Sequence, residues 1–260
     1  MSFGTMRIAL YLSIAILGGC GDRSPDPQLL ATDVHVTVAQ NSFVLPFVAL
    51  DTHALGERSF LLNRVASCSR TAEKQTAFLR ESADHRNPLP LDLVSVKIDQ
   101  YGATDFDSSA GKVCPQLSRQ WARSVCSGSQ DVINRALPRS FKLVDIGRLQ
   151  LDGPGGPTNC RRDRARRTLP TTVGGPAVLV CPAHVYGGDE DEFHKAVVRI
   201  SGDLGALWTV WRNDSSGESA EEMAIREGKA ITLFVEAALG EREDYPNLIA
   251  DMHVLQRPLP

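Results

Sequence analysis

The sequence predicts an α+β domain in which helices pack on one face of a mainly antiparallel sheet. Strand-like segments with alternating apolar residues follow one another along the chain, without the regular alternation of strands and helices that builds a parallel sheet. Two helical segments come last, one beginning after Ser219 and one at Tyr245. The chain has 260 residues, 42% hydrophobic and 23% charged, which is typical of a soluble globular protein with a sizeable core.

The first predicted elements form a hairpin. Val34, Val36 and Val38 alternate with other residue types, which predicts a strand, and a second extended segment at 43–48 follows a short turn. Five further elements are predicted before residue 152: a helix at 71–80, a strand at 91–99, a helix between Cys114 and Cys126, a helical turn at 132–137 and a strand at 141–151.

The C-terminal part of the chain carries the clearest patterns. Three consecutive strands are predicted at 177–184, 193–200 and 205–211. Before them, residues 152–176 form the longest irregular region, which we interpret as a surface excursion within one domain. Ser219 and Glu222 have the spacing of a capping box, so they predict the start of a long helix. Gly240 ends that helix, and an apolar repeat from Tyr245 to Leu255 predicts the last one.

The N-terminal segment has the composition of an export signal. Arg7 is followed by an apolar run from Ile8 to Leu17, which is well short of the roughly 20 residues that span a bilayer as a helix. The sequence Leu17-Gly18-Gly19-Cys20 resembles the lipobox of bacterial lipoproteins. This resemblance implies that residues 1–19 are a cleaved signal peptide and that Cys20 receives diacylglycerol and acyl chains such as palmitate.

The resemblance also predicts where the protein works. Gly21, directly after the lipidated cysteine, implies an outer-membrane lipoprotein that faces the periplasm. We expect residues 20–32 to be a lipidated tether of at most about 40 Å and residues 33–260 to be a single α+β domain. The membrane is then a partner through the lipid on Cys20.

The cysteine spacing limits which disulfides can form. With Cys20 acylated, five of the six cysteines remain, and disulfides are permitted in the periplasm. A continuous helix between Cys114 and Cys126 would separate them by about 18 Å, whereas a bridge needs Cα atoms roughly 4.4–6.8 Å apart. We therefore predict that these two do not pair with each other.

Two other pairings remain open. Our first choice is Cys160 with Cys181, which would close the irregular basic region into a loop. The second choice joins Cys68 to Cys114 or to Cys126. A structural cross-link is preferred to a reactive thiol, because no cysteine carries the motif of a catalytic partner.

Two surfaces are candidates for binding a partner. The first is a run of five arginines within seven residues, namely Arg161, Arg162, Arg164, Arg166 and Arg167. Such a run is either a solvated loop or a contact for anionic lipid or an acidic protein. The second is the strand with Trp208 and Trp211, which alternation places on opposite faces, so that one faces the core and the other is covered by a second layer or binds a partner.

One arrangement could bind a metal. A hairpin centred on Asp189 would place His184 directly opposite His194, with Glu192 nearby as a third ligand. The alternative is an acidic, solvated hairpin tip that prevents edge pairing.

The sequence lacks the usual catalytic motifs of hydrolases, nucleotide-binding proteins and zinc enzymes. The pI near 6.1 argues against a nucleic-acid partner, and no cofactor is expected. The leading hypothesis is a non-enzymatic binding module for a protein or an envelope component, including an inhibitor or immunity factor. The alternatives are a metal-dependent hydrolase that uses His184 and His194, and a structural envelope lipoprotein.

Overall fold

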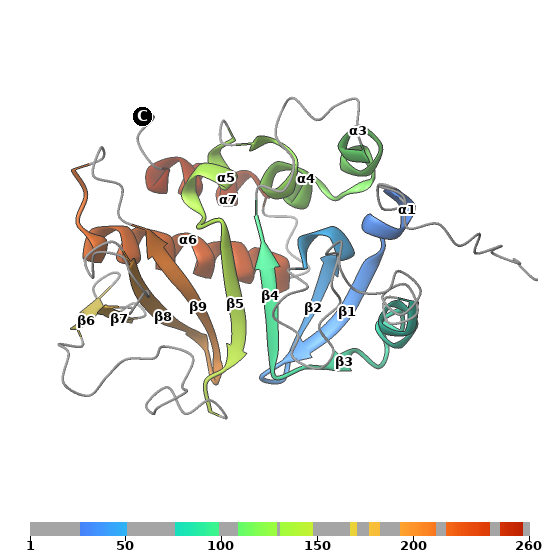
Figure 1. Cartoon of the computed structure of the whole chain (residues 1–260), viewed down its shortest axis with the longest axis horizontal. Coiled ribbons are helices and arrows are strands. Elements are labelled where there is room, and N and C mark those ends of the chain that lie inside the picture. Colours follow the sequence, from blue (N-terminus) through green and yellow to red (C-terminus); the bar gives the residue numbers. More distant parts are fainter. Residues whose placement is uncertain are drawn as a thin grey trace, which may run out of the picture.

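A computed structural model describes residues 27–50, 76–98, 109–128, 131–147, 167–170, 177–182, 193–211, 217–239 and 245–256. These residues form two sheets, both mainly antiparallel, and a set of helices that ends with two at the C-terminus. The fold is therefore α+β, as the sequence predicts. Figure 1 shows the two sheets lying next to each other, with the long helix α6 running across the strands.

The smaller sheet is built around the predicted hairpin. Strand β1 (Asp33–Val38) pairs antiparallel with β2 (Asn41–Pro46), and the short β3 (Leu89–Pro90) joins β1 in parallel. The hairpin turn is Ala39 and Gln40, both with positive φ, and the amide of Asn41 donates to the Ala39 carbonyl. The alternating valines of β1 are buried in the core, as their period of two requires.

The larger sheet has six strands in the order β4-β5-β9-β8-β7-β6, and every neighbouring pair is antiparallel. Its strands are β4 (Leu93–Lys97), β5 (Ser140–Asp145), β6 (Arg167–Pro170), β7 (Ala177–Pro182), β8 (Phe193–Ser201) and β9 (Leu204–Trp211). The predicted run of three strands near the C-terminus is therefore confirmed as β7, β8 and β9.

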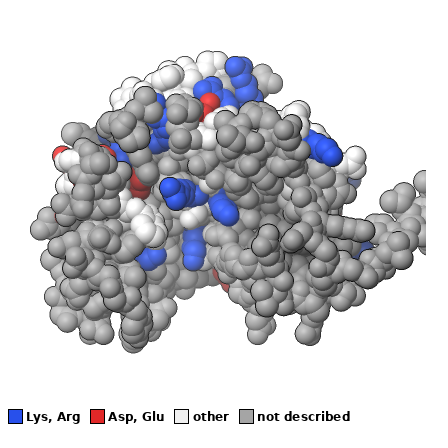
Figure 2. All heavy atoms as spheres, turned by 45° about the horizontal axis from the view of Figure 1, so that its top comes forward, with Lys and Arg blue, Asp and Glu red and all other residues white. Residues whose placement is uncertain are grey.

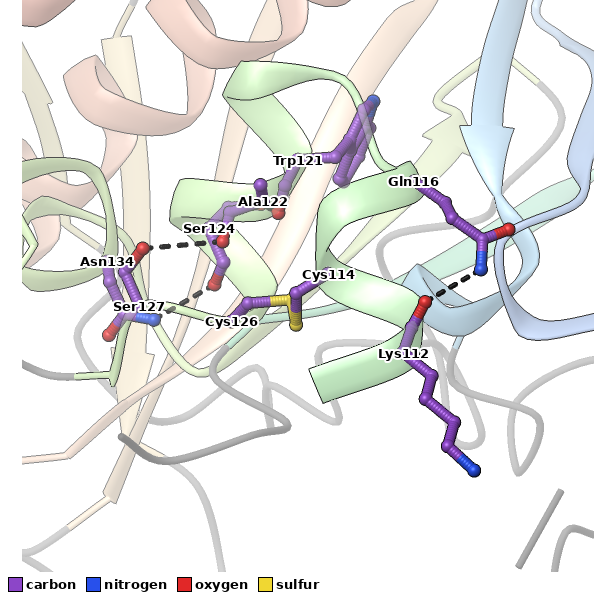
Figure 3. Close-up of a disulfide and its surroundings, with 9 residues drawn as sticks. All are labelled: Lys112, Cys114, Gln116, Trp121, Ala122, Ser124, Cys126, Ser127 and Asn134. Carbon is purple, nitrogen blue, oxygen red and sulfur yellow. Dashed lines mark hydrogen bonds between the residues drawn. A yellow bond between two sulfur atoms is a disulfide. The ribbon is translucent and has the colours of Figure 1, made fainter. Parts of the chain in front are cut away.

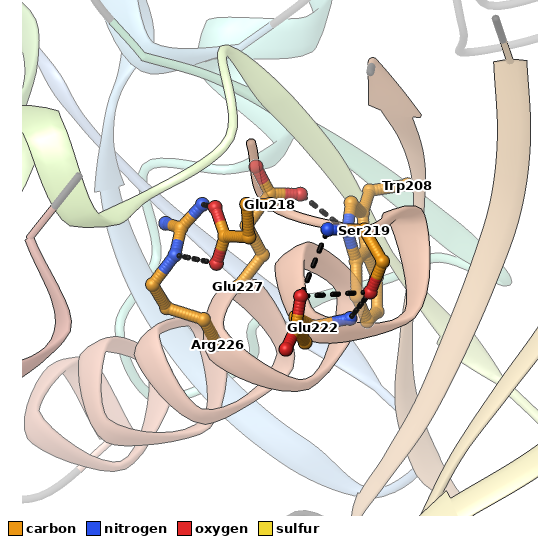
Figure 4. Close-up of polar contacts among 6 residues, drawn as sticks. All are labelled: Trp208, Glu218, Ser219, Glu222, Arg226 and Glu227. Carbon is orange, nitrogen blue, oxygen red and sulfur yellow. Dashed lines mark hydrogen bonds and ion pairs between the residues drawn. The ribbon is translucent and has the colours of Figure 1, made fainter. Parts of the chain in front are cut away.

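Helix α6 (Ala220–Leu239) contacts β6, β7, β8 and β9 of the larger sheet and β2 of the smaller one. Its Phe234 ring packs edge-on against the rings of Trp121 and Phe141, with centroids 5.1 and 6.5 Å apart. The capping box is confirmed, because the Ser219 backbone N–H donates to the Glu222 carboxylate and the Glu222 N–H donates to the Ser219 hydroxyl (Figure 4). These hydrogen bonds lower the pKa of Glu222.

Shorter helices complete the layer around α6. Helix α7 (Tyr245–Leu255) packs against α6 and α5 (Val132–Ala136). Asp131 caps α5 by accepting from the Ile133 N–H and forms an ion pair with Arg123 of α4 (Arg119–Val125). Residues 76–81 are also helical. No helix within the described ranges is both long and apolar enough to cross a membrane.

Two boundaries differ from those that the sequence indicates. Pro27–Leu30 forms helix α1, and Leu30 is only 1% exposed within the core, so these residues belong to the packed domain although we expected a tether up to residue 32. The irregular region 152–176 contains strand β6, in which Thr168 lies opposite Leu179 of β7. The sequence does not predict this strand because it ends in Pro170, although an edge strand tolerates proline.

The prediction that Cys114 and Cys126 do not pair is wrong, because they form a disulfide with Cα atoms 5.9 Å apart (Figure 3). The chain between them is a 3₁₀ turn followed by a separate helix, not one continuous helix. Helix α3 (Ser109–Val113) tightens into the 3₁₀ turn η5 (Cys114–Gln116), and Leu117 and Ser118 are extended, with ψ of 151° and 152°. The chain therefore reverses before α4, and this break brings the two ends together.

The second-choice bridge from Cys68 to one of these two cysteines is excluded by the same finding. The preferred bridge between Cys160 and Cys181 lies outside the described residues, apart from the backbone of Cys181 in β7. It stays a prediction.

We predict that loss of the Cys114–Cys126 disulfide lowers stability. Removing a cross-link over a loop of this length costs about 3 kcal/mol, chiefly because the unfolded chain gains freedom. The variant Cys114→Ser/Cys126→Ser should unfold at a lower denaturant midpoint than the oxidised wild type. Peptide mapping without reductant should recover the two cysteines in one cross-linked fragment, and two free thiols at these positions would contradict the structure.

Gly205 lies where two strands and a side chain meet closely. A Cβ atom on this residue would be 2.1 Å from Cδ1 of Ile146 and 2.9 Å from the carbonyl oxygen of Val198. Position 205 therefore requires glycine, because a side chain there would collide with Ile146 and with the backbone of β8.

We predict that Gly205→Ala destabilises the fold by about 1–3 kcal/mol, because the added methyl group overpacks this site. Thermal unfolding of the single variant measures the cost. In an Ile146→Ala background the same change should cost less, since the nearest atoms are gone. An equal cost in both backgrounds would show that Ile146 is not the obstacle.

Candidate functional site

The larger sheet has one face toward α6 and one face away from it, which we call the outer face. Directly opposite residues in an antiparallel pair share a face. Phe141 lies opposite Trp208, and both are buried in the core together with Phe234 of α6. The residues between these positions point to the other side, so Lys142 of β5 and its partner Leu207 of β9 lie on the outer face.

The described strand residues of the outer face carry charges of one sign only. Among the described strand residues of this face, the charged side chains are Lys97, Lys142, Lys195 and Arg199, and none is a carboxylate. We call these four residues the basic outer face. Lysine and arginine side chains gather in a hollow in the middle of the view in Figure 2. The whole chain has a formal net charge of −3, so this concentration of positive charge is local.

The four cations differ in their surroundings. Lys97 and Arg199 are exposed, and Arg199 donates to the Gly202 carbonyl and lies 3.5 Å from the Asp203 carboxylate. Lys142 and Lys195 are half-buried. Val197 and Leu207, which lie opposite each other on this face, are each only 4% exposed, so the centre of the outer face is largely withdrawn from water.

The surroundings of Lys195 disfavour its positive charge. Its ammonium group donates a hydrogen bond of 2.5 Å to the Thr209 hydroxyl, directly across the strand pair. Burial lowers the pKa of Lys195, and the positive charge of Lys142 lowers it further. Both effects disfavour the charged form, so the face holds two ammonium groups in positions that repel each other.

The two tryptophans lie on opposite faces of β9. Trp211 is 61% exposed on the outer face, two residues beyond Thr209. Trp208 is 3% exposed and donates from its indole nitrogen to the Glu227 carboxyl at 2.9 Å (Figure 4). Of the two candidate contact residues, Trp208 is therefore part of the core and only Trp211 is available to a partner.

We predict opposite sensitivities for the two tryptophans. Trp208→Phe removes the donor to Glu227, which is itself 1% exposed, and should destabilise the fold by about 2 kcal/mol. Trp211→Phe is the matched control and should change stability by less than about 0.5 kcal/mol. Denaturant titration of both variants measures this difference, and equal losses would contradict the assignment of Trp208 alone to the core.

The predicted pair of histidines has a different register. Pro182, not His184, lies opposite His194, so the partner of His194 differs by two residues from the predicted one and the centre of the hairpin moves from Asp189 to Gly188. His194 lies opposite Val210, on the face toward α6. His184 and Glu192 lie outside the described residues, and the metal site that they would complete stays a prediction.

The arginine run is described only at its end. Arg161, Arg162, Arg164 and Arg166 lie outside the described residues, and Arg167 is the first residue of β6, opposite Val180, rather than part of a loop. Cys20 also lies outside them.

A second hollow lies between the sheets, at the turn ends of the strands. It has a volume of about 650 Å³ and is lined by Asp92, Asp145 and Asp203, together with uncharged residues of β1, β3 and the neighbouring turns. Asp203 and Asp145 approach the same point: a Cβ on Gly147 would be 3.1 Å from Oδ2 of Asp203 and 3.3 Å from Oδ1 of Asp145. Among the residues that the structure describes, no group of three His, Cys, Asp or Glu residues is arranged to hold a metal ion.

Comparison with protein-family models, with curated proteins and with solved structures finds no match to this chain. The only support for a functional site is therefore the geometry of the described residues. The basic outer face was missed in the sequence because its lysines come from three separate strands. The signal that could have found it was the parity of Lys97, Lys142 and Lys195 relative to the apolar residues beside them.

Proposed function

We propose that this protein is a membrane-anchored periplasmic lipoprotein that acts as a non-enzymatic binding module, and that its basic outer face binds an anionic envelope component. The observation that carries the proposal is the pair Lys142 and Lys195, two half-buried cations on a face without strand carboxylates in its described part. Positive charges that are held close together without a counter-charge cost free energy in the unliganded protein. An anionic ligand removes that cost.

Partial burial makes the face more selective than an ordinary charged surface. Exposed ion pairs contribute little because water and salt screen them. At the centre of this sheet Val197 and Leu207 exclude water, so a charge-assisted hydrogen bond to Lys195 is stronger than one at the rim.

The membrane anchor supports an envelope ligand. Lipidation of Cys20, which the lipobox resemblance implies, would leave only residues 21–26 between the lipid and α1. An extended segment of that length reaches roughly 20 Å. The domain would then stay close to the bilayer surface, where anionic groups are concentrated.

We predict that the anchor depends on one sulfur atom. In living cells, radiolabelled palmitate should be incorporated into the wild-type protein and lost completely in Cys20→Ala. Cys126→Ala is the matched control and should keep the label, because Cys126 is held in the domain by its disulfide with Cys114. Equal labelling of wild type and Cys20→Ala would contradict the proposal.

We predict that ligand contact maps to the outer face. A photoreactive residue at Ser140, which is exposed opposite Lys97, should give a cross-linked product in living cells. The product should disappear in Lys97→Glu/Lys142→Glu, because the reversed charges repel an anion. A probe at Gln116, exposed in η5, is the control site and should give no product that depends on those lysines. An undiminished product in the charge-reversed variant would refute binding at this face.

A further inference from the structure

We propose that Lys142, Lys195 and Thr209 form a subsite for the phosphate group of a membrane lipid headgroup, with Trp211 at its rim. This inference rests on the proposed function and names the ligand of the same face. The three polar residues come from adjacent strands, β5, β9 and β8, and their side chains share one face. Strands lie about 4.8 Å apart, so two lysine side chains that flank β9 can reach one group above Thr209.

The arrangement suits an anion with several oxygen atoms and more than one charge. An ammonium group has three donors, and among the described residues that of Lys195 gives one to Thr209, so two can donate to ligand oxygens. A phosphate group provides several acceptor oxygens and can bridge the two ammonium groups. Its negative charge would favour the charged form of Lys195, against the burial and the Lys142 repulsion that lower its pKa.

Trp211 favours a lipid source over a soluble phosphate. Tryptophan is enriched at membrane–water interfaces, where its ring lies among headgroups. Trp211 is 61% exposed on the same face as Thr209 and two residues further along β9, which is about 7 Å along a strand. The anchor that the lipobox resemblance implies would hold the domain near the bilayer as a whole.

The first test measures binding to the phosphate group itself. The acylated protein, purified in a neutral detergent, is titrated with glycerol 1-phosphate, and binding is followed by calorimetry. Lys142→Gln and Lys195→Gln should each weaken binding about tenfold or more, the loss of one charge-assisted contact. Lys112→Gln, at an exposed position on α3, is the matched control and should bind as the wild type does. No binding to the wild type, or equal binding to all variants, would overturn the subsite.

The second test separates a ligand-binding lysine from a structural one. A lysine needed for folding lowers stability when it is removed, whereas Lys195→Met should raise the Tm by roughly 2 °C, because the methionine avoids the burial of a charge and its repulsion by Lys142. The same variant should lose glycerol phosphate binding. A fall in Tm together with unchanged binding would show that Lys195 has only a structural role.

The pH dependence follows from the sign of the pKa shift. The pKa of Lys195 is lowered in the free protein, so the ammonium loses its proton at a lower pH than an ordinary lysine, and an anionic ligand raises the pKa again. Binding should therefore take up protons, and affinity should fall as the pH rises through the lowered pKa. In Lys195→Gln this part of the pH profile should be flat, and a profile equal to the wild type would contradict the assignment.

The third test identifies the source of the phosphate. The acylated protein is placed in nanodiscs of phosphatidylcholine alone or with phosphatidylglycerol, and the fluorescence of Trp211 is taken as the difference between wild type and Trp211→Phe. A blue shift only with phosphatidylglycerol supports the lipid headgroup. No shift, with glycerol phosphate still bound in detergent, overturns the lipid source. Loss of both signals while the Ser140 cross-link persists would reject this inference and leave the proposed binding function standing, for instance with an acidic protein as the partner.

Discussion

The packing of α6 against one face of the six-stranded sheet is the constraint on which the rest of the structure depends. Phe234 fills the space between Phe141 and Trp121, so this face must be apolar at its centre. Because strand residues alternate, every polar residue between these positions is forced to the opposite face. Lys97, Lys142 and Lys195 occur on different strands, yet this single constraint places all three on one surface.

The polar groups on the two faces of the larger sheet have different partners. On the side of α6, the buried Glu227 accepts from Trp208, and nearby Arg226 forms a two-point ion pair with Glu218, which orients the start of the helix (Figure 4). Arg226 keeps one buried guanidinium nitrogen, Nη1, without a hydrogen-bond partner among the described residues. On the outer face, Lys195 is hydrogen-bonded to Thr209, but its charge is opposed by burial and by Lys142. The two like charges on the outer face are the feature that supports our proposal of an anionic ligand there.

The parts of the fold that the sequence could predict are those governed by local pattern. The hairpin of β1 and β2, the meander from β7 to β9 and the capped start of α6 each depend on alternation or on a short motif. The Cys114–Cys126 disulfide could not be found in this way, because a helical repeat from Pro115 to Val125 hides the two extended residues that reverse the chain. The register of β7 and β8 pairs Cys181 with Lys195 and therefore Pro182 with His194. This register cannot be predicted from the residues of the hairpin alone. The basic outer face has the same origin, since a surface made of three strands exists only after the strands are paired.

Positive and negative side chains lie at different positions along the strands of the larger sheet. Asp145 lies at the end of β5, three residues beyond Lys142, and Asp203 lies in the turn between β8 and β9, beside Asp92 in the hollow between the sheets. Negative charge is therefore collected at the turn end of the same strands whose centre is positive. An anion that approaches this face is repelled from the turn end and attracted to the centre, which orients it before contact and raises the association rate at low ionic strength. Strand order thus separates the two signs of charge along a single sheet, although the chain as a whole has a formal net charge of −3.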